Sequence, residues 1–304
     1  MLKLRFAFLA TALACASAVQ GQAPATAPAP APALPDADPA IWVVKDPDTT
    51  IYLFGTFHAL DGKSAWFNDE VKAAFDRSKE LVLEIPPVDD PASIQPIIMK
   101  YALDTSGKPL SDRLSPATKE KFAAALAKLG APPNAFDKFT PFFAALTLTM
   151  ANAQKLGMTA ANGSEAVLTK AAKDDKKPIS GLETIEYQMS IFANLTDAEQ
   201  IAMLEQTLDE LDDVAGLFKK MNDHWSKGDS EGMAALINEM NAKSPKLYKA
   251  LLTDRIANWA EWIDKRLDQP GVVFVGVGAG HFGGETSVQA LLAKRGIKSE
   301  RLTQ

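Results

Sequence analysis

Two of the three histidines in this 304-residue chain occur in the same local pattern. His58 ends the sequence Gly-Thr-Phe-His at 55–58, and His281 ends Gly-Ala-Gly-His at 278–281. Each motif follows an apolar run that predicts a β-strand. Ligands of open α/β sheets collect beyond the carboxyl ends of strands, where glycine lets the backbone turn sharply. We therefore expect both imidazoles to face one crevice and to form a shared polar site.

Two carboxylates follow short apolar runs in a similar way. Glu84 ends Leu-Val-Leu-Glu at 81–84, where a charge beside the core needs a partner. That partner is a metal ion, or else Arg255 or a lysine in an ion pair. Glu183 stands just before a predicted helix. It is a candidate general base, a candidate partner of a histidine, or a first-turn carboxylate that stabilises the helix dipole.

Arg255 and His224 are the other polar residues with a chemical interpretation. Arg255 lies on an amphipathic helix with Trp259 and Trp262, and it is a candidate clamp for a substrate carboxylate or oxyanion. The alternative is a surface ion pair, which is the commoner role of such an arginine. His224 has no glycine around it and follows no strand, so we expect a structural role.

The combination of imidazoles and carboxylates suits a divalent metal such as Mn, Co or Zn. The predicted ligands are His58, Glu84 and His281, and the predicted catalytic residues are Glu183 and Arg255. Two histidines and one carboxylate would leave room for a water molecule, whose pKa a metal can lower toward about 7. A second carboxylate would then take the proton. This chemistry is that of a metal-dependent hydrolase, with a peptidase as one form of it.

Other sequence motifs do not offer a competing enzyme class. The chain contains neither His-Glu-x-x-His nor Gly-x-Ser-x-Gly, and the glycines at 276–280 lack the spacing of a dinucleotide-binding fingerprint. The main alternative is a binding protein that uses the same pocket for a metal, haem or small peptide without turnover. A surface that docks a partner at 142–156 is a third hypothesis, although core packing explains its apolar residues more simply.

The apolar spacing predicts the elements that would position these residues. Four predicted strands surround the motifs: a hairpin at 41–44 and 51–54, a strand at 81–85, and a buried strand at 271–278. Helical patterns are predicted at 64–79, throughout 115–169 with a stop at 130–133, and at 197–227, 230–241, 244–267 and 287–295. A short strand is predicted at 178–182 and an edge strand at 298–302. The expected fold class is α/β, with a mixed central sheet covered by helices and a helical insertion in the middle of the chain.

These motifs, in this order, resemble the TraB/GumN family, which also includes the Tiki metalloproteases of animals. The resemblance rests on the first Gly-Thr-x-His, the Leu-Val-Leu-Glu strand, the Gly-Leu-Glu-Thr segment and the final Val-Gly-Ala-Gly-His, and the segment 108–115 adds to it. It extends from about Pro39 to Leu302, so we predict a TraB/GumN-like domain at 40–304.

The resemblance to the Tiki branch implies a divalent metal held by the Gly-x-x-His histidines with acidic help, and hydrolysis of peptide bonds. It implies no agreed reaction for bacterial members. Two residues depart from the family pattern. Glu165 stands in Gly-Ser-Glu where relatives often have Gly-Val-Asp, and Ile256 follows Arg255 where relatives often have Asn. No role of that Asp or Asn is carried over to this chain.

The N-terminal residues predict export. Lys3 and Arg5 precede an apolar stretch, a pattern typical of a signal peptide at 1–21, with cleavage after Ala18 or Gly21. Residues 22–39 are rich in Ala and Pro and predict an extended linker. The expected location is the periplasm or the exterior, and acylation of Cys15, the sole cysteine, is the less favoured alternative.

Composition limits the partners. The formal charge is -6 and the sequence pI is near 5.2, which argues against a nucleic acid, because binding its phosphates needs a basic face. The expected partner is a peptide or a small-molecule substrate of unknown identity, and no transmembrane domain is expected once the signal peptide is removed. The mature chain would hold no thiolate ligand, which excludes a cysteine-based zinc site.

Overall fold

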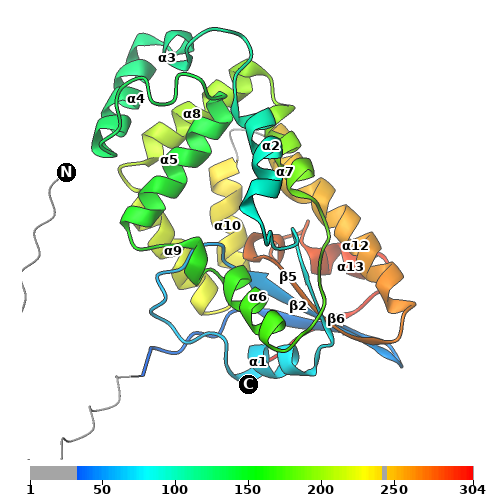
Figure 1. Cartoon of the computed structure of the whole chain (residues 1–304). Coiled ribbons are helices and arrows are strands. Elements are labelled where there is room, and N and C mark those ends of the chain that lie inside the picture. The colour runs from blue at the N-terminus through cyan, green and yellow to red at the C-terminus, as the bar shows by residue number, and fades with distance from the viewer. Residues whose placement is uncertain (1–32, 242–244, 304) are drawn as a thin grey trace, which may run out of the picture. The chain divides into compact units, whose positions relative to one another are not determined.

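The central feature of the computed structural model, which describes residues 33–241 and 245–303, is a mixed β-sheet (Figure 1). In the described part the strand order is β4-β3-β5-β2-β1-β6. The strands are β1 (Ile41–Lys45), β2 (Thr49–Thr56), β3 (Glu80–Leu83), β4 (Ile179–Gly181), β5 (Gly271–Gly278) and β6 (Ser299–Arg301). β2, β5, β3 and β4 are parallel neighbours, whereas β1 pairs antiparallel with both β2 and β6. The predicted α/β class and mixed sheet are confirmed.

The hairpin of β1 and β2 follows from its turn sequence. The side chain of Asp46 accepts hydrogen bonds from the backbone N–H groups of Asp48 (3.1 Å) and Thr49 (2.7 Å), as aspartate does in a tight turn. Alternate residues of the hairpin then face opposite sides of the sheet. The predicted hairpin is present in this register, with Ile41 opposite Phe54.

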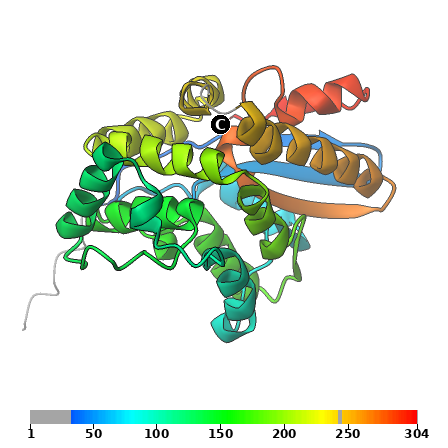
Figure 2. The ribbon, with the colours of Figure 1, turned by 90° about the horizontal axis from the view of Figure 1, so that it is seen from above.

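Helices cover both faces of the sheet (Figure 2). One face packs against α1 (Asp69–Arg77), α6 (Ser164–Asp174), α9 (Val214–Ser226) and α10 (Ser230–Asn241). The other face packs against α12 (Asp254–Leu267) and α13 (Val288–Lys294). The central strand β5 contributes buried residues to both layers, Phe274 to the first and Val273 and Val275 to the second. This explains its continuous apolar sequence, which is typical of a strand with two buried faces.

The predicted helical insertion has a core of its own. It contains α2 (Pro91–Ala102), α3 (Leu110–Arg113), α4 (Pro116–Lys128), α5 (Pro141–Lys155), the 3-10 turn η1 (Ala160–Asn162), α7 (Ile185–Ala193) and α8 (Asp197–Glu210). Phe122 and Leu126 of α4 pack with Leu148 of α5 and Leu204 of α8. Arg113, from the family segment at 108–115, pairs with Asp104 and with Asp197 at the start of α8.

Two of the predicted long helices differ from the structure. The helix predicted at 197–227 is broken between α8 and α9. The last turn of α8 has no basic residue, and acidic side chains near a helix C-terminus oppose its dipole. The helix predicted at 244–267 begins as α11 (Pro245–Tyr248) and contains a π-helical segment, η2 (Lys249–Thr253), before α12. A short 3-10 turn, η3 (Ala279–His281), carries the second histidine motif.

The N-terminal predictions are only partly covered by the described residues. The signal peptide at 1–21, Cys15 and most of the linker at 22–39 lie outside them. The last residues of the linker pack onto the domain: Ala37 is buried and its N–H donates to the carbonyl of Ala65 (2.9 Å). Across the described ranges, no helix has both the length and the apolarity that a membrane span requires.

Candidate functional site

The parallel strands β2, β5 and β3 bring three predicted site residues to one edge of the sheet. His58, His281 and Glu84 each follow the carboxyl end of one of these adjacent strands. A Cβ atom placed on Gly278 would lie 3.1 Å from Glu84 Oε1, 3.5 Å from His281 Cδ2 and 3.8 Å from His58 Nε2. The three side chains therefore meet beside Gly278, where a larger residue would press against Glu84.

Glu84 is held by a buried ion pair with Arg255. Glu84 Oε2 lies 2.5 Å from Arg255 Nη2 and accepts a hydrogen bond from Gln188 (3.0 Å). Its Oε1 accepts the backbone N–H of Gly278 at 2.7 Å. Burial opposes the charge on Glu84, but Arg255, His281 and His58 outweigh it and lower the pKa of Glu84 to about 2. The ion-pair alternative for Glu84 is thus what the structure shows, with Oε1 on the side of the histidines.

Glu183 belongs to the same buried cluster. Its carboxylate accepts hydrogen bonds from Arg255 Nε (3.0 Å), Trp259 Nε1 (2.9 Å) and Gln188 Nε2 (2.9 Å). The side chain is 5% exposed. Arg255 therefore lies between two carboxylates, and Gln188 donates to both. The sequence did not single out Gln188, which occurs on α7 with no motif around it.

His281 is buried against this cluster. Its side chain is 6% exposed, its Nε2 lies 3.7 Å from Glu84 Oε1, and its ring packs against Trp259 with the centroids 4.5 Å apart. Among the described residues, its buried Nδ1 atom has no hydrogen-bond partner. Burial lowers the pKa of His281 to about 3, so the imidazole is neutral at physiological pH. A neutral buried imidazole is the form that can bind a metal.

His58 is exposed and paired with a carboxylate that the sequence analysis did not assign to the site. Its Nδ1 lies 2.6 Å from Glu165 Oε1, and the two side chains are 71% and 26% exposed. The charge of Glu165 raises the pKa of His58 to about 9. The sequence signal for Glu165 was its position in Gly-Ser-Glu, where relatives often have Gly-Val-Asp. We interpreted that difference as the loss of the family's Asp and did not expect Glu165 itself to supply a carboxylate to the site.

The first residues of α6 fix the backbone at His58. Ser164 is fully buried, and its Oγ accepts the N–H of Phe57 at 2.9 Å. Gly163 lies so close to the His58 carbonyl that a Cβ atom would be 2.2 Å from its oxygen. This close packing against Phe57 and His58 therefore explains why the motif Gly-Ser-Glu begins with a glycine and a serine.

Replacing Gly163 with alanine should cost about 1–3 kcal/mol of unfolding free energy, because the added methyl overlaps the His58 carbonyl and one segment has to shift. Urea unfolding measures the effect. Gly216→Ala on α9 is a suitable control, since its methyl would meet only the end of the exposed Asp213 side chain. Equal stability of Gly163→Ala and the wild type would contradict the close approach.

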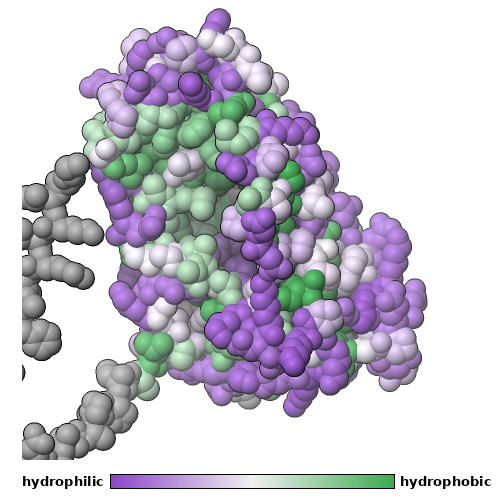
Figure 3. All heavy atoms as spheres, viewed as in Figure 1, coloured by the Kyte–Doolittle hydropathy of each residue, from purple (hydrophilic) through white to green (hydrophobic). Residues whose placement is uncertain are grey.

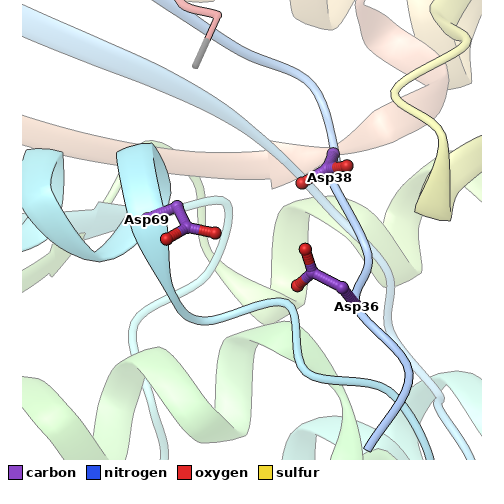
Figure 4. Close-up of side chains that lie close together, drawn as sticks. All are labelled: Asp36, Asp38 and Asp69. Atoms are coloured by element: carbon purple, nitrogen blue, oxygen red, sulfur yellow. The ribbon is translucent and has the colours of Figure 1, made fainter.

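An acidic triad, formed by other residues than the histidines, also has a geometry that could hold a metal ion. Among the described residues, the group whose candidate ligand atoms all lie within 4.8 Å of one another is Asp36, Asp38 and Asp69 (Figure 4). These exposed carboxylates could hold a metal ion. His58, Glu84 and His281 surround one point, but their three donor atoms stand wider than that limit.

The third histidine is part of a helix junction. His224 Nδ1 lies 2.8 Å from Asp229 Oδ2, and Asp229 also accepts the N–H of Gly232 in the first turn of α10. A Cβ on Gly232 would be 2.3 Å from His224 Nδ1. These contacts fit the structural role expected for His224.

The surface on the side shown in Figure 1 is hollowed between α5 on one side and α2 and α7 on the other, with hydrophobic residues around the hollow (Figure 3). Exposed large apolar side chains occur on three helices of this part of the chain: Met150 on α5, Met99 on α2 and Tyr187 on α7. The insertion therefore presents apolar surface as well as packing its own core.

The chain matches known proteins over nearly all of the described domain. It is 26% identical to the uncharacterized protein YbaP of Escherichia coli (strain K12) over 254 residues, which are 84% of this chain and 92% of that protein. It is 24% identical to an uncharacterized protein of Treponema pallidum (strain Nichols) over 268 residues, 84% of this chain and 80% of that protein. No solved structure gives a significant match. The model of the TraB/PrgY/gumN family matches residues 40–301, and the chain therefore belongs to that family.

Proposed function

We propose that this protein is a metal-dependent hydrolase whose ion is held by His58, His281 and Glu84. The observation that carries the proposal is the convergence of these three side chains beside Gly278, at the carboxyl ends of adjacent parallel strands. Ligand sites of α/β proteins form at such strand ends.

The chemistry of the donors fits a divalent ion. His281 is neutral with Nε2 3.7 Å from Glu84 Oε1, and Glu84 is ionised. His58, whose pKa is raised to about 9, would release its Nε2 proton on binding the ion. Two imidazole nitrogens and one carboxylate oxygen suit Mn, Co or Zn. The donors have to close around an ion, and His58 is the one with an exposed ring. A bound ion would supply Lewis acidity that polarises a scissile bond and activates water.

In this proposal Arg255 and Glu183 act through Glu84. Arg255 is 6% exposed and both of its carboxylate partners are buried, so it orients Glu84 and offsets its charge. Glu183 uses its oxygens to hold Arg255, Trp259 and Gln188. The roles of general base and substrate clamp, which the sequence suggested for Glu183 and Arg255, stay predictions, and these contacts favour positioning instead.

One observation supports a second candidate, a pocket that binds a metal, haem or small peptide without turnover. Glu183 accepts several hydrogen bonds from described side chains, and Glu84 is assigned to the ion, so neither carboxylate is an obvious proton acceptor. A hydrolase needs such a base within reach of the attacking water.

The metal content of purified protein tests the proposal. We expect about one equivalent of Mn, Co or Zn in the wild type, and loss of that metal in His58→Ala/His281→Ala, because two of three ligands are removed. Elemental analysis is the measurement, with His224→Ala as a control that keeps its metal. An Asp36→Asn/Asp69→Asn variant should also keep it, which separates this site from the acidic triad.

The outcomes separate the candidates. If the double histidine variant keeps its metal and the aspartate variant loses it, the ion is bound at the triad and the proposal is contradicted. Absence of metal from the wild type, even after reconstitution, would favour a metal-free pocket. When the metal is present, a peptide-library screen with and without chelator follows: chelator-sensitive cleavage supports the hydrolase, and binding without cleavage supports the second candidate.

A further inference from the structure

The N-terminus of α6 contacts His58 through both its backbone and its ring. Gly163 and Ser164 pack against the Phe57–His58 peptide, and Ser164 Oγ both accepts from the N–H of Phe57 and donates to its carbonyl (2.9 and 3.3 Å). The next residue, Glu165, reaches the imidazole. Three consecutive residues at the start of α6 therefore contact this segment, and Glu165 alone reaches the ring, whose side chain is 71% exposed.

The contact with Glu165 distinguishes the two ring nitrogens. An ionised carboxylate only accepts hydrogen bonds, so the 2.6 Å contact requires His58 Nδ1 to carry a proton. When the ring is neutral, the lone pair is then on Nε2, the atom that lies 3.8 Å from the Cβ position of Gly278. The nitrogen that faces Glu84 and His281 is therefore the one able to act as a ligand.

We propose that Glu165 is a positioning residue, which holds the His58 ring with Nε2 directed at the space shared with Glu84 and His281. The role of Glu165 in metal binding rests on the proposed function, whereas its contact with the His58 ring does not depend on a metal. Carboxylates that accept the second N–H of a ligating histidine fix its ring orientation and tautomer, and their loss commonly weakens metal binding 10- to 100-fold.

The test compares Glu165→Gln, Glu165→Asp and Glu165→Ala with the wild-type chain. Zn²⁺ and Co²⁺ affinities are measured by competition with a chromophoric chelator, and we expect Glu165→Ala to bind about 10- to 100-fold more weakly. Glu165→Gln, whose amide oxygen can still accept the Nδ1 proton, should retain most of the affinity. Glu165→Asp is one methylene shorter and should fall between the two.

A second readout needs no metal. In chelator-treated protein labelled with ¹³C-histidine, relaxation of the His58 ring C–H groups reports the ring's mobility, and the three histidines of the chain keep the spectrum simple. The ring should be restrained in the wild type and in Glu165→Gln, and much freer in Glu165→Ala. Asp229→Asn is the matched control, because the His224–Asp229 contact (2.8 Å) has the same chemistry outside the site.

Each combination of results is decisive. Unchanged ring mobility and unchanged affinity in Glu165→Ala would overturn the inference. A freed ring in a chain that binds no metal even as wild type would support positioning by Glu165 while removing the proposed function. If Glu165→Ala unfolds, as urea midpoints would show, Glu165→Gln and Glu165→Asp still decide, because a purely structural role would not rank them by their ability to reach Nδ1.

Discussion

Replacing Arg255 with methionine should lower the unfolding free energy by about 3–5 kcal/mol, the usual result of removing one partner from a buried ion pair. Methionine keeps much of the volume but leaves Glu84 and Glu183 buried without a cation. Both carboxylates are nearly inaccessible, with side chains 11% and 5% exposed. Urea unfolding, monitored by tryptophan fluorescence and by circular dichroism, measures the loss.

Two further variants separate the charge effect from packing. Arg255→Lys keeps the charge and should recover part of the loss, although an ammonium cannot reproduce the contacts with both carboxylates and the Leu251 carbonyl. The triple variant Arg255→Met/Glu84→Gln/Glu183→Gln removes all three charges and should be clearly more stable than Arg255→Met alone.

A surface arginine serves as the control for the Arg255 series. Arg295 pairs with Asp264 where both side chains are more than one-third exposed, so Arg295→Met should cost no more than about 1 kcal/mol. Equal effects of Arg255→Met and Arg295→Met would mean that the buried cluster does not depend on its central cation. A triple variant as unstable as Arg255→Met would assign the loss to packing.

The strands were predictable because their sequences carry the signal locally. Ile41 to Val44 and Ile51 to Phe54 are β-branched and aromatic runs around a turn that Asp46 stabilises, and β5 is apolar throughout because both of its faces are buried. The break between α8 and α9 was missed because apolar spacing continues across it. The π-helical segment, in which the Leu251 carbonyl accepts a hydrogen bond from Arg255 Nη1 four residues later, was missed because apolar spacing does not distinguish a π-turn from an α-helix.

The candidate site was predictable where glycine marked a strand end. His58 and His281 were found that way, and the parallel pairing of β2 with β5 places them as expected. The strand order was not predictable. The sequence had offered Glu84 as a ligand from its place at a strand end, and the order brings β3 beside β5. Glu165 and Gln188 reach the site from helices whose placement depends on tertiary packing. The ion pair of Glu84 with Arg255 joins residues 171 positions apart, so the sequence could only offer it as an alternative.

The unfolding free energy of the metal-free protein should be greatest near pH 6.5, because two site histidines titrate in opposite directions. Burial lowers the pKa of His281 to about 3, so below pH 6.5 the unfolded chain takes up a proton that the folded chain does not. Stability should then fall by about 2 kcal/mol between pH 6.5 and pH 5. Glu165 raises the pKa of His58 to about 9, so its contribution is complete below pH 6.5 and is lost as the pH rises toward 9.

The stability curve has two limbs, the fall below pH 6.5 and the fall above it. Substitutions, tested in the presence of chelator, can assign each limb to one histidine. His281→Gln should flatten the limb between pH 5 and 6.5, and His58→Gln should flatten the limb between pH 6.5 and 9, while His224→Gln keeps both. Glu84 does not obscure the acid limb: its lowered pKa, about 2, gives stability that is present above pH 4.5 and is lost only below it. If stability instead rose as the pH fell from 6.5 to 5 and His281→Gln removed that rise, the buried imidazole would be charged in the folded state. Such a result would contradict its assignment as a neutral ligand, since an imidazolium has no lone pair for a metal.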